Sequence, residues 1–471
     1  MLSTVFLLFF IVSLEWMEDD RSQAVCKYEA PKMFDDPEAQ TYLLLLSLLP
    51  EAITETMLRP LVPFMIRMLS KDLDGDRLES EVGIRAGLFG GVFYMPLLVM
   101  NIVWGAASDS LGRKPILLMG LLFGGLTTIA LGLNTSSFQL ALVCRFLAGI
   151  FGGNSTVAKG ALGEIHSDAK GRSWAFSLYG SLYAFSGIVG PLIGGVLVEM
   201  AGEERSPYFG VCLLGAILSA LAFFGTVVWY KEVEKHRVDE SVKVKEGAED
   251  SAPIPQQEKW VLSPAIKPSK LTISIVLYVT LAFCNMFWAS TIPLIFASSL
   301  ELSGLGFSAM DASFAMTIPS ISKLFFQSLF CEWIVRKLGA NRSYCVGMGA
   351  IVPAMYGLGL LGGTAGSHVF PIVTVCLITL GFVEALAYLS MTIVISESVP
   401  STSLGSAFGL TSTFAALVRS LAPPLAGTAW EYAVELKAPW VAFLVVQAVA
   451  LISVGIAFLT QPTEELKEKS E

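Results

Sequence analysis

The chain alternates between long apolar segments and short polar links. Twelve of these segments are long and apolar enough to cross a bilayer as a helix, which takes about 20 mostly apolar residues. The predicted spans are residues 41–69, 84–104, 115–133, 138–160, 173–200, 208–230, 271–297, 309–332, 343–362, 368–395, 402–429 and 438–460. Several exceed the minimum length, which permits tilt or a kink. The pattern predicts an all-α membrane protein with twelve transmembrane helices.

Residues 231–270 form the only long polar stretch in the interior of the sequence. Their mixture of acids, lysines and prolines cannot bury a core and is typical of a flexible linker. Six apolar segments precede the linker and six follow it, and the halves repeat short motifs. Gly190-Pro191-Leu192-Ile193-Gly194 corresponds to Pro423-Pro424-Leu425-Ala426-Gly427, and the link ending at Gly112 corresponds to the one ending at Gly339. We therefore predict two pseudo-symmetric six-helix bundles related by an axis along the membrane normal.

This division gives the expected domain organisation and orientation. The predicted parts are an N-terminal cytoplasmic or interfacial segment (1–40), a first bundle (41–230), a cytoplasmic linker (231–270), a second bundle (271–460) and a cytoplasmic tail (461–471). Most lysines and arginines of the links fall after spans 2, 4, 6 and 8, and this bias marks the cytoplasmic side. The charge pattern thus predicts a multi-pass membrane protein with both termini in the cytoplasm, and leaves plasma and vacuolar membranes as alternatives.

Composition and motifs exclude several other classes of protein. Apolar residues make up 54% of the chain and charged residues 15%, against about 25% charged in a typical soluble domain. No basic stripe suits a nucleic acid, and the three histidines and seven cysteines show no metal-binding spacing. We find no phosphate-binding loop and no nucleophile–base cluster. We therefore expect neither an enzyme nor a bound metal or cofactor.

The most informative motif lies in the link between spans 2 and 3. Residues 104–115 read Trp-Gly-Ala-Ala-Ser-Asp-Ser-Leu-Gly-Arg-Lys-Pro and place a carboxylate and two cations at one membrane face. The motif resembles the loop between helices 2 and 3 of the major facilitator superfamily, with a serine at position 110 where that family often has arginine. The resemblance implies a conformational latch formed by Gly105, Asp109, Gly112 and Arg113, with Glu164 as a second partner of Arg113.

Ionisable residues inside the predicted spans are candidates for the transport site. A charge in hydrocarbon costs at least about 2.5–3.5 kcal/mol, so such residues normally face a cavity or a partner. Glu51, Glu55 and Arg59 share one face of helix 1, and helix 4 contains Arg145. The second half adds Lys323, Glu384 and Arg419. Two interpretations of these residues are possible. They form a proton or substrate site, or they form simple charge pairs, Glu55–Arg59 and Glu384 with Lys323 or Arg419.

Two further resemblances concern helices 4 and 5. Arg145 looks like the family's helix 4 arginine, which would tune the pKa of a neighbouring glutamate, because arginine itself stays protonated. Gly190, Pro191, Gly194 and Gly195 resemble the glycine-proline motif of the proton-antiporting branches. Glycines permit close helix contact and the proline permits bending, so a packing role without directional meaning is the alternative.

From about residue 41 to 460 the chain resembles the twelve-helix drug:proton antiporters, including the tetracycline-resistance-like and zinc-induced-facilitator-like transporters. The resemblance implies a monomeric secondary transporter in the lipid bilayer that moves a small organic molecule out of the cytosol in exchange for protons. A facilitator or a transporter-like receptor without proton coupling is the alternative. The energy source would be the proton gradient, with no cofactor.

Overall fold

The computed structural model describes residues 36–70, 76–166, 169–201, 207–232, 270–399 and 404–459. These residues form helices and links, with no strand among them. Most of the predicted N-terminal segment and linker, and all of the predicted tail, lie outside this part of the chain.

The first half contains the helices that correspond to predicted spans 1–6. They are α2 (Pro37–Leu58), η2 (Arg59–Leu61), α3 (Val62–Leu69), α4 (Asp76–Leu111), α5 (Arg113–Leu133), α6 (Phe138–Phe151), α7 (Asn154–Ile165), α8 (Ala169–Ala201) and α9 (Pro207–Trp229). Helix α2 begins four residues before the predicted span, because Pro37 suits a first helical turn where its missing N–H is not needed. Span 1 consists of three consecutive helical pieces, α2, η2 and α3, and span 4 of two, α6 and α7.

The second half repeats this arrangement. Its helices are α10 (Lys270–Ala297), η3 (Leu300–Leu302), α11 (Ala309–Leu329), α12 (Cys331–Leu338), α13 (Ala340–Leu361), α14 (Val369–Glu397), α15 (Leu404–Glu435), η5 (Pro439–Phe443) and α16 (Leu444–Leu459). The reciprocal bonds between Ser308 and Asp311 form a capping box that starts α11. The two glycines that the sequence repeat aligns have similar backbones, with φ of 102° at Gly112 and 81° at Gly339.

Ten helical segments of the described residues are long and apolar enough to span a membrane, and the bent pair α11–α12, with an angle of 57°, makes an eleventh. Helix α15 occupies the place of the remaining predicted span, 402–429. It is 32 residues long but less apolar, because prolines, serines and threonines interrupt its hydrophobic positions. Its charged residue near the middle, Arg419, lies among them.

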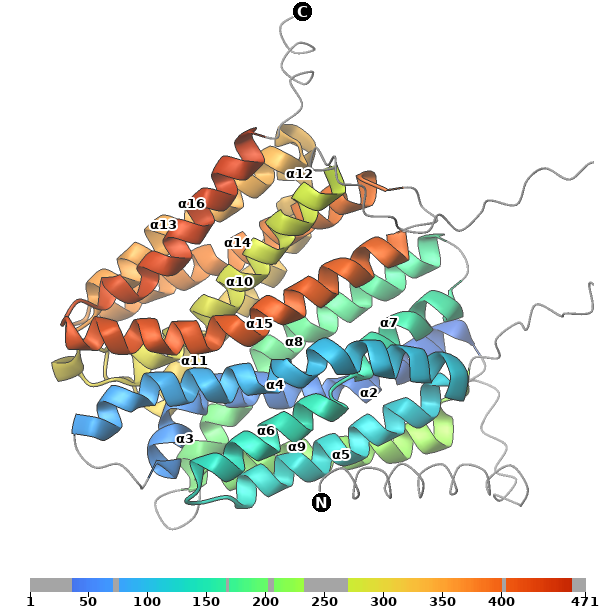
Figure 1. Cartoon of the computed structure of the whole chain (residues 1–471), viewed down its shortest axis with the longest axis horizontal. Helices are drawn as coiled ribbons and strands as arrows, with labels where there is room; N and C mark the ends of the chain where they lie inside the picture. Colours follow the sequence, from blue (N-terminus) through green and yellow to red (C-terminus); the bar gives the residue numbers. More distant parts are fainter. Residues whose placement is uncertain are drawn as a thin grey trace, which may run out of the picture.

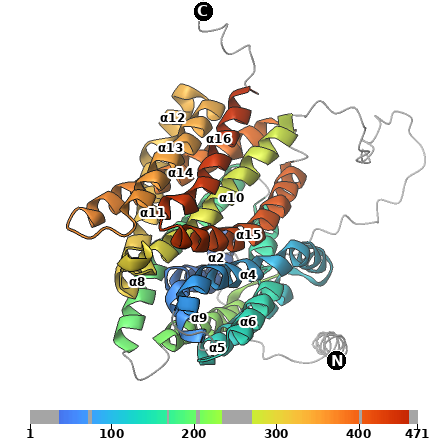
Figure 2. The same ribbon diagram turned by 60° about the vertical axis from the view of Figure 1, so that its left-hand side comes forward.

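The two halves lie side by side, and two helix pairs cross between them. Helix α4 of the first half packs along α15 of the second, and α8 packs along α11. Figures 1 and 2 show the halves meeting along these pairs and diverging toward one end of the molecule. We call the end that carries the link between α4 and α5 the latch end, and the other the far end.

Glycines allow the crossing pairs to approach closely at the far end. A Cβ atom added to Gly83 would lie 2.6 Å from the Gly427 carbonyl oxygen of α15, and one added to Gly195 would lie 2.7 Å from the Cβ atom of Ser313 in α11. Nearer the latch end of the same two helices, a Cβ atom added to Gly105 or Gly180 would meet no atom of the described residues within 4 Å. The seams between the halves are therefore closed at the far end and open toward the latch end.

The hydrophobic core has the same asymmetry. One large cluster includes residues of both halves, for example Met57 and Phe287. Toward the latch end, a second cluster contains only first-half residues, such as Leu117 and Tyr230, and a third contains only second-half residues around Cys331. In the described conformation the halves are thus packed together at the far end and separated at the latch end.

Candidate functional site: the latch

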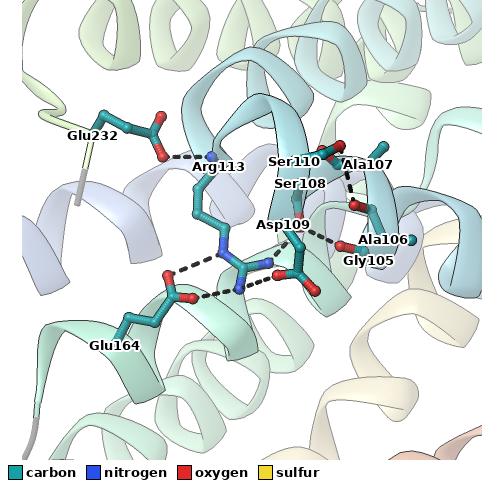
Figure 3. A network of polar contacts seen from close by, with 9 residues as sticks. All are labelled: Gly105, Ala106, Ala107, Ser108, Asp109, Ser110, Arg113, Glu164 and Glu232. Atoms are coloured by element: carbon teal, nitrogen blue, oxygen red, sulfur yellow. Dashed lines mark hydrogen bonds and ion pairs between the residues drawn. The ribbon is translucent and has the colours of Figure 1, made fainter. Parts of the chain in front are cut away.

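The latch motif forms a polar network around Arg113, the first residue of α5 (Figure 3). The guanidinium contacts Asp109 at 2.8 Å and binds both oxygens of Glu164, from Nη2 at 2.7 Å and from Nε at 3.1 Å. It also donates a hydrogen bond to the Ser108 hydroxyl. The side chain of Arg113 is buried, whereas Asp109 is 58% exposed. The pairing of Arg113 with Glu164 and Asp109 agrees with the sequence prediction; the predicted gating role stays a prediction.

Gly112 allows the chain to turn between α4 and α5. Its φ of 102° is a conformation that side chains with a Cβ rarely adopt. An added Cβ atom would also lie 3.0 Å from the carboxylate carbon of Glu232. Both features favour glycine here, and the turn brings Arg113 back against α4.

Glu232 is a member of the latch that sequence reasoning missed. Its two carboxylate oxygens accept hydrogen bonds from the backbone N–H groups of Arg113, at 2.5 Å, and Lys114, at 2.8 Å. These amides at the start of α5 have no intrahelical partner, and the helix dipole favours a negative charge at this position. The sequence places this carboxylate two residues after the sixth predicted span but gives no sign of the backbone amides that it binds.

Lys114 strengthens the same connection from the opposite direction. Its ammonium group donates to the carbonyl oxygens of Val227, at 2.8 Å, and Tyr230, at 2.7 Å, at the end of α9. Burial raises the pKa of the Tyr230 phenol above its usual value, so the ring stays uncharged beside the latch. The first residues after α9 are therefore bound to the start of α5.

Candidate functional site: charges between the halves

Arg145 of α6 pairs with Glu55 of α2 inside the first half. Its Nη2 atom lies 3.0 Å from Oε2 of Glu55, and the two side chains are 9% and 23% exposed. The guanidinium also lies over the rings of Phe89 and Phe93, with distances of 4.9 and 4.6 Å to the ring centroids. Arg145 thus has a counterion and two ring contacts, as expected for a charge that the membrane would otherwise destabilise, while its buried Nε has no hydrogen-bond partner among the described residues.

Glu51 lies one helical turn before Glu55 on α2. Among the described residues, no side chain forms a hydrogen bond or an ion pair with its carboxylate. The structure therefore distinguishes the two glutamates that the sequence left equivalent: Glu55 has a counterion and Glu51 has none.

The second half contains a comparable pair. Nζ of Lys323 in α11 lies 2.6 Å from Oε1 of Glu384 in α14, and 6.0 Å from the centre of the Tyr388 ring. Of the two bridges that the sequence left open for Glu384, the structure has the one with Lys323. Arg419 of α15 instead lies near Tyr388, Tyr278 and Tyr94.

A cavity of about 50 Å³ lies between the halves at the far end of the site. Glu55, Arg59, Tyr94 and Arg145 line it from the first half. Met286, Ser290, Pro293 and Pro423 close it from the second. Seven ionisable residues were predicted to line a cavity. Three of them, Glu55, Arg59 and Arg145, line this one, whereas Glu51, Lys323, Glu384 and Arg419 do not.

The glycine-proline motif places α8 between α2 and α11. Gly194 approaches the backbone of Met57, with 2.9 Å from an added Cβ atom to the carbonyl oxygen, and Gly190 approaches Thr56. Gly195 faces α11 instead, and Pro191 sits inside a helix that continues from Ala169 to Ala201. The motif thus packs one helix against both halves; its relation to antiport stays a prediction.

Within the described residues, no group of three or more His, Cys, Asp or Glu side chains could hold a metal ion. The polar groups instead form two charge pairs inside the membrane and a latch at one end of the molecule. The seams between the halves are open toward that end. A two-part helical bundle with these features is typical of a membrane transporter.

Sequence comparison identifies the family. The profile of the Major Facilitator Superfamily matches residues 44–423 and 286–470, and the chain belongs to this family. It is 22% identical over 432 residues to the protein ZINC INDUCED FACILITATOR 1 of Arabidopsis thaliana, which covers 86% of this chain and 88% of that protein. It is 27% identical over 195 residues to the class H tetracycline resistance protein of Pasteurella multocida, covering 41% and 44%.

The fold is also found in solved structures. A bacterial homologue of the human lysosomal transporter Spinster, in an inward-facing and occupied conformation, matches with a TM-score of 0.66 and 14% identity over 89% of this chain and 95% of that one. At this identity the likeness concerns the fold alone.

Proposed function

We propose that the protein exports a small organic molecule in exchange for protons, and that Glu51 is the proton-binding group. The observation that carries the proposal is the contrast on α2: Glu55 is paired with Arg145, whereas Glu51 has no counterion among the described residues. A carboxylate in a membrane without a counterion is stabilised by protonation. A relative whose name states tetracycline resistance supports export as the direction.

The mechanism is alternating access, in which the halves rock about the site between them. In our proposal the latch end and both termini face the cytoplasm, so the described conformation opens inward. Release of the proton from Glu51 in this state would be followed by substrate binding and closure of the latch end. We propose that one chain suffices, that the lipid bilayer is its only structural partner, and that the proton gradient replaces any cofactor.

The test uses purified protein in proteoliposomes with an imposed pH gradient and tetracycline as the probe. We expect Glu51→Gln to abolish uphill accumulation but to retain exchange of labelled for unlabelled tetracycline, because only the coupling group is lost. Glu38→Gln, an exposed carboxylate in the first turn of the same helix, is the matched control.

Three results would contradict the proposal. Uphill accumulation by Glu51→Gln would place the proton site elsewhere, with Glu384 as the next candidate. Transport that follows the tetracycline gradient alone in the unmodified protein, with no proton flux, would indicate a facilitator. Failure to move tetracycline or any other solute, with saturable binding retained, would favour a receptor.

A further inference from the structure

The charges between the halves do not balance, and the imbalance suggests the chemistry of the substrate. The seven intramembrane ionisable residues that the sequence singled out are three glutamates and four basic residues. The charges cancel within each of two pairs, Arg145–Glu55 and Lys323–Glu384. Arg59, Arg419 and Glu51 remain, so the site keeps an excess of positive charge whether Glu51 is protonated or not.

The two remaining arginines come from opposite halves of the molecule. No carboxylate of the described residues forms an ion pair with either Arg59, in η2, or Arg419, in α15. Both guanidinium groups are close enough to interact with the phenol of Tyr94 in α4. The excess charge is therefore concentrated around Tyr94, where the halves meet, and is not spread along the bundle.

The space beside these groups suits a small acidic group. Arg59 and Tyr94 line the cavity of about 50 Å³, and Ser290 adds a hydroxyl from the second half. This volume holds only a few water-sized groups, of about 30 Å³ each, and is too small for a ring system. Arginine suits such a group because its planar fork binds carboxylates and phosphates through two hydrogen bonds.

Aromatic side chains continue from this cavity into the second half. The rings of Tyr278 and Tyr388 make an edge contact with centroids 5.5 Å apart, and Arg419 lies beside both. An acidic group in the cavity would leave the rest of a ligand against these tyrosines, on the side that opens toward the latch end. Apolar walls with a few polar anchors are the usual composition of a small-molecule site.

We infer that the transported molecule is an organic anion, whose acidic group binds Arg59 in the cavity and whose aromatic or apolar body lies against Tyr278 and Tyr388, beside Arg419. This inference rests on the proposed function only in assuming that the site between the halves binds the substrate. An anion in this position contacts residues of both halves, so its binding affects both of them.

The test measures binding in detergent without any gradient, which separates it from proton coupling. Fluorescein and rhodamine 123 share a xanthene ring system but carry opposite charges at pH 7.5. We expect fluorescein to bind saturably, by fluorescence anisotropy, and benzoate but not benzamide to compete. Arg59→Gln and Arg419→Gln should each weaken fluorescein binding at least tenfold, and Arg59→Lys should restore part of it.

The control is Arg336→Gln, which removes an exposed guanidinium at the latch end and should leave binding unchanged. Thermal unfolding of each variant checks that it is folded. The inference is overturned if rhodamine 123 binds and Glu51→Gln abolishes that binding, or if fluorescein binding survives in both glutamine variants. Absence of saturable binding by fluorescein and benzoate in the unmodified protein overturns it as well. If proton coupling fails while the anion binding stands, only the proposed function is wrong.

Discussion

Two arginine–glutamate pairs in this protein have the same chemistry and very different surroundings, so they allow a quantitative prediction. In the latch, the side chains of Arg113 and Glu164 are 9% and 30% exposed. In α12, those of Arg336 and Glu332 are 78% and 73% exposed and lie one helical turn apart. We expect the latch pair to stabilise the fold and the α12 pair to contribute little.

The magnitude follows from the bonds that Glu164→Gln removes. A hydrogen bond to a charged group contributes about 1.5–3 kcal/mol. Glu164 makes two such bonds to Arg113, but Asp109 remains as a counterion and the site is partly open to solvent, so we expect a loss of about 2 kcal/mol. An exposed pair one turn apart contributes about 0.3–0.5 kcal/mol. With about 2–4 °C per kcal/mol, as in domains of 150–250 residues, Glu164→Gln lowers the melting temperature by about 4–8 °C.

The buried thiols provide the assay. Cys144, Cys212, Cys284 and Cys376 are buried and free, so a thiol-reactive fluorescent dye reports unfolding during heating in detergent. Double-mutant cycles for Arg113–Glu164 and Arg336–Glu332 isolate the two coupling energies. Equal coupling energies in the two pairs, or none in the latch, would refute the reasoning. Asp109→Asn should slow transport. Because Asp109 is 58% exposed, this substitution should lower the melting temperature much less than Glu164→Gln does.

Two further predictions concern the connections between helices. Glu232→Ala leaves the first amides of α5 without an acceptor. Because losing a helix cap costs typically about 1 kcal/mol, the substitution should lower the melting temperature by about 2–4 °C. The thiol-dye assay measures the melting temperature, and an unchanged value would contradict the capping role. Gly87→Leu should force α4 away from α15 at Pro423 and Pro424, on the far side of the site from the latch. A cysteine introduced by Ser290→Cys should then react faster with a thiol reagent, whereas Gly105→Leu, where an added Cβ has space, should not change the rate.

The helical spans and the latch pairing were predictable because they depend on local patterns. Runs of about 20 apolar residues have few alternatives to a membrane helix. Asp109 and Arg113 are four residues apart around a glycine turn, so they meet wherever that turn forms. The helix ends were less predictable. Helix α4 extends from Asp76 to Leu111, well beyond the predicted 84–104, because its backbone bonds continue into polar flanks that hydropathy does not mark.

The charge pairs between helices were not predictable, because they depend on which helices become neighbours. Glu55 had Arg59 one turn away and Arg145 ninety positions along the chain, and the structure pairs it with the distant one. A one-turn spacing brings two side chains near each other but does not select between that contact and another across a helix interface. Glu232 was missed for the same reason: its partners are backbone amides, which have no signature in the sequence.

The glycines of α8 indicate how the same helix can serve both conformations of the transporter. Gly187 and Gly195 face α11 in the closed part of the seam, where Ser320 and Ser313 approach them. Gly180 precedes Gly187 by seven residues, a spacing that keeps it on nearly the same face of the helix, yet nothing lies within 4 Å of its added Cβ. A small residue on a contact face has a packing function only when another helix approaches it. The open position at Gly180 is therefore where α11 would approach when the halves rock and the latch end closes. In the alternating-access cycle that we propose, the seam would use Gly187 and Gly195 in the described conformation and Gly180 in the other.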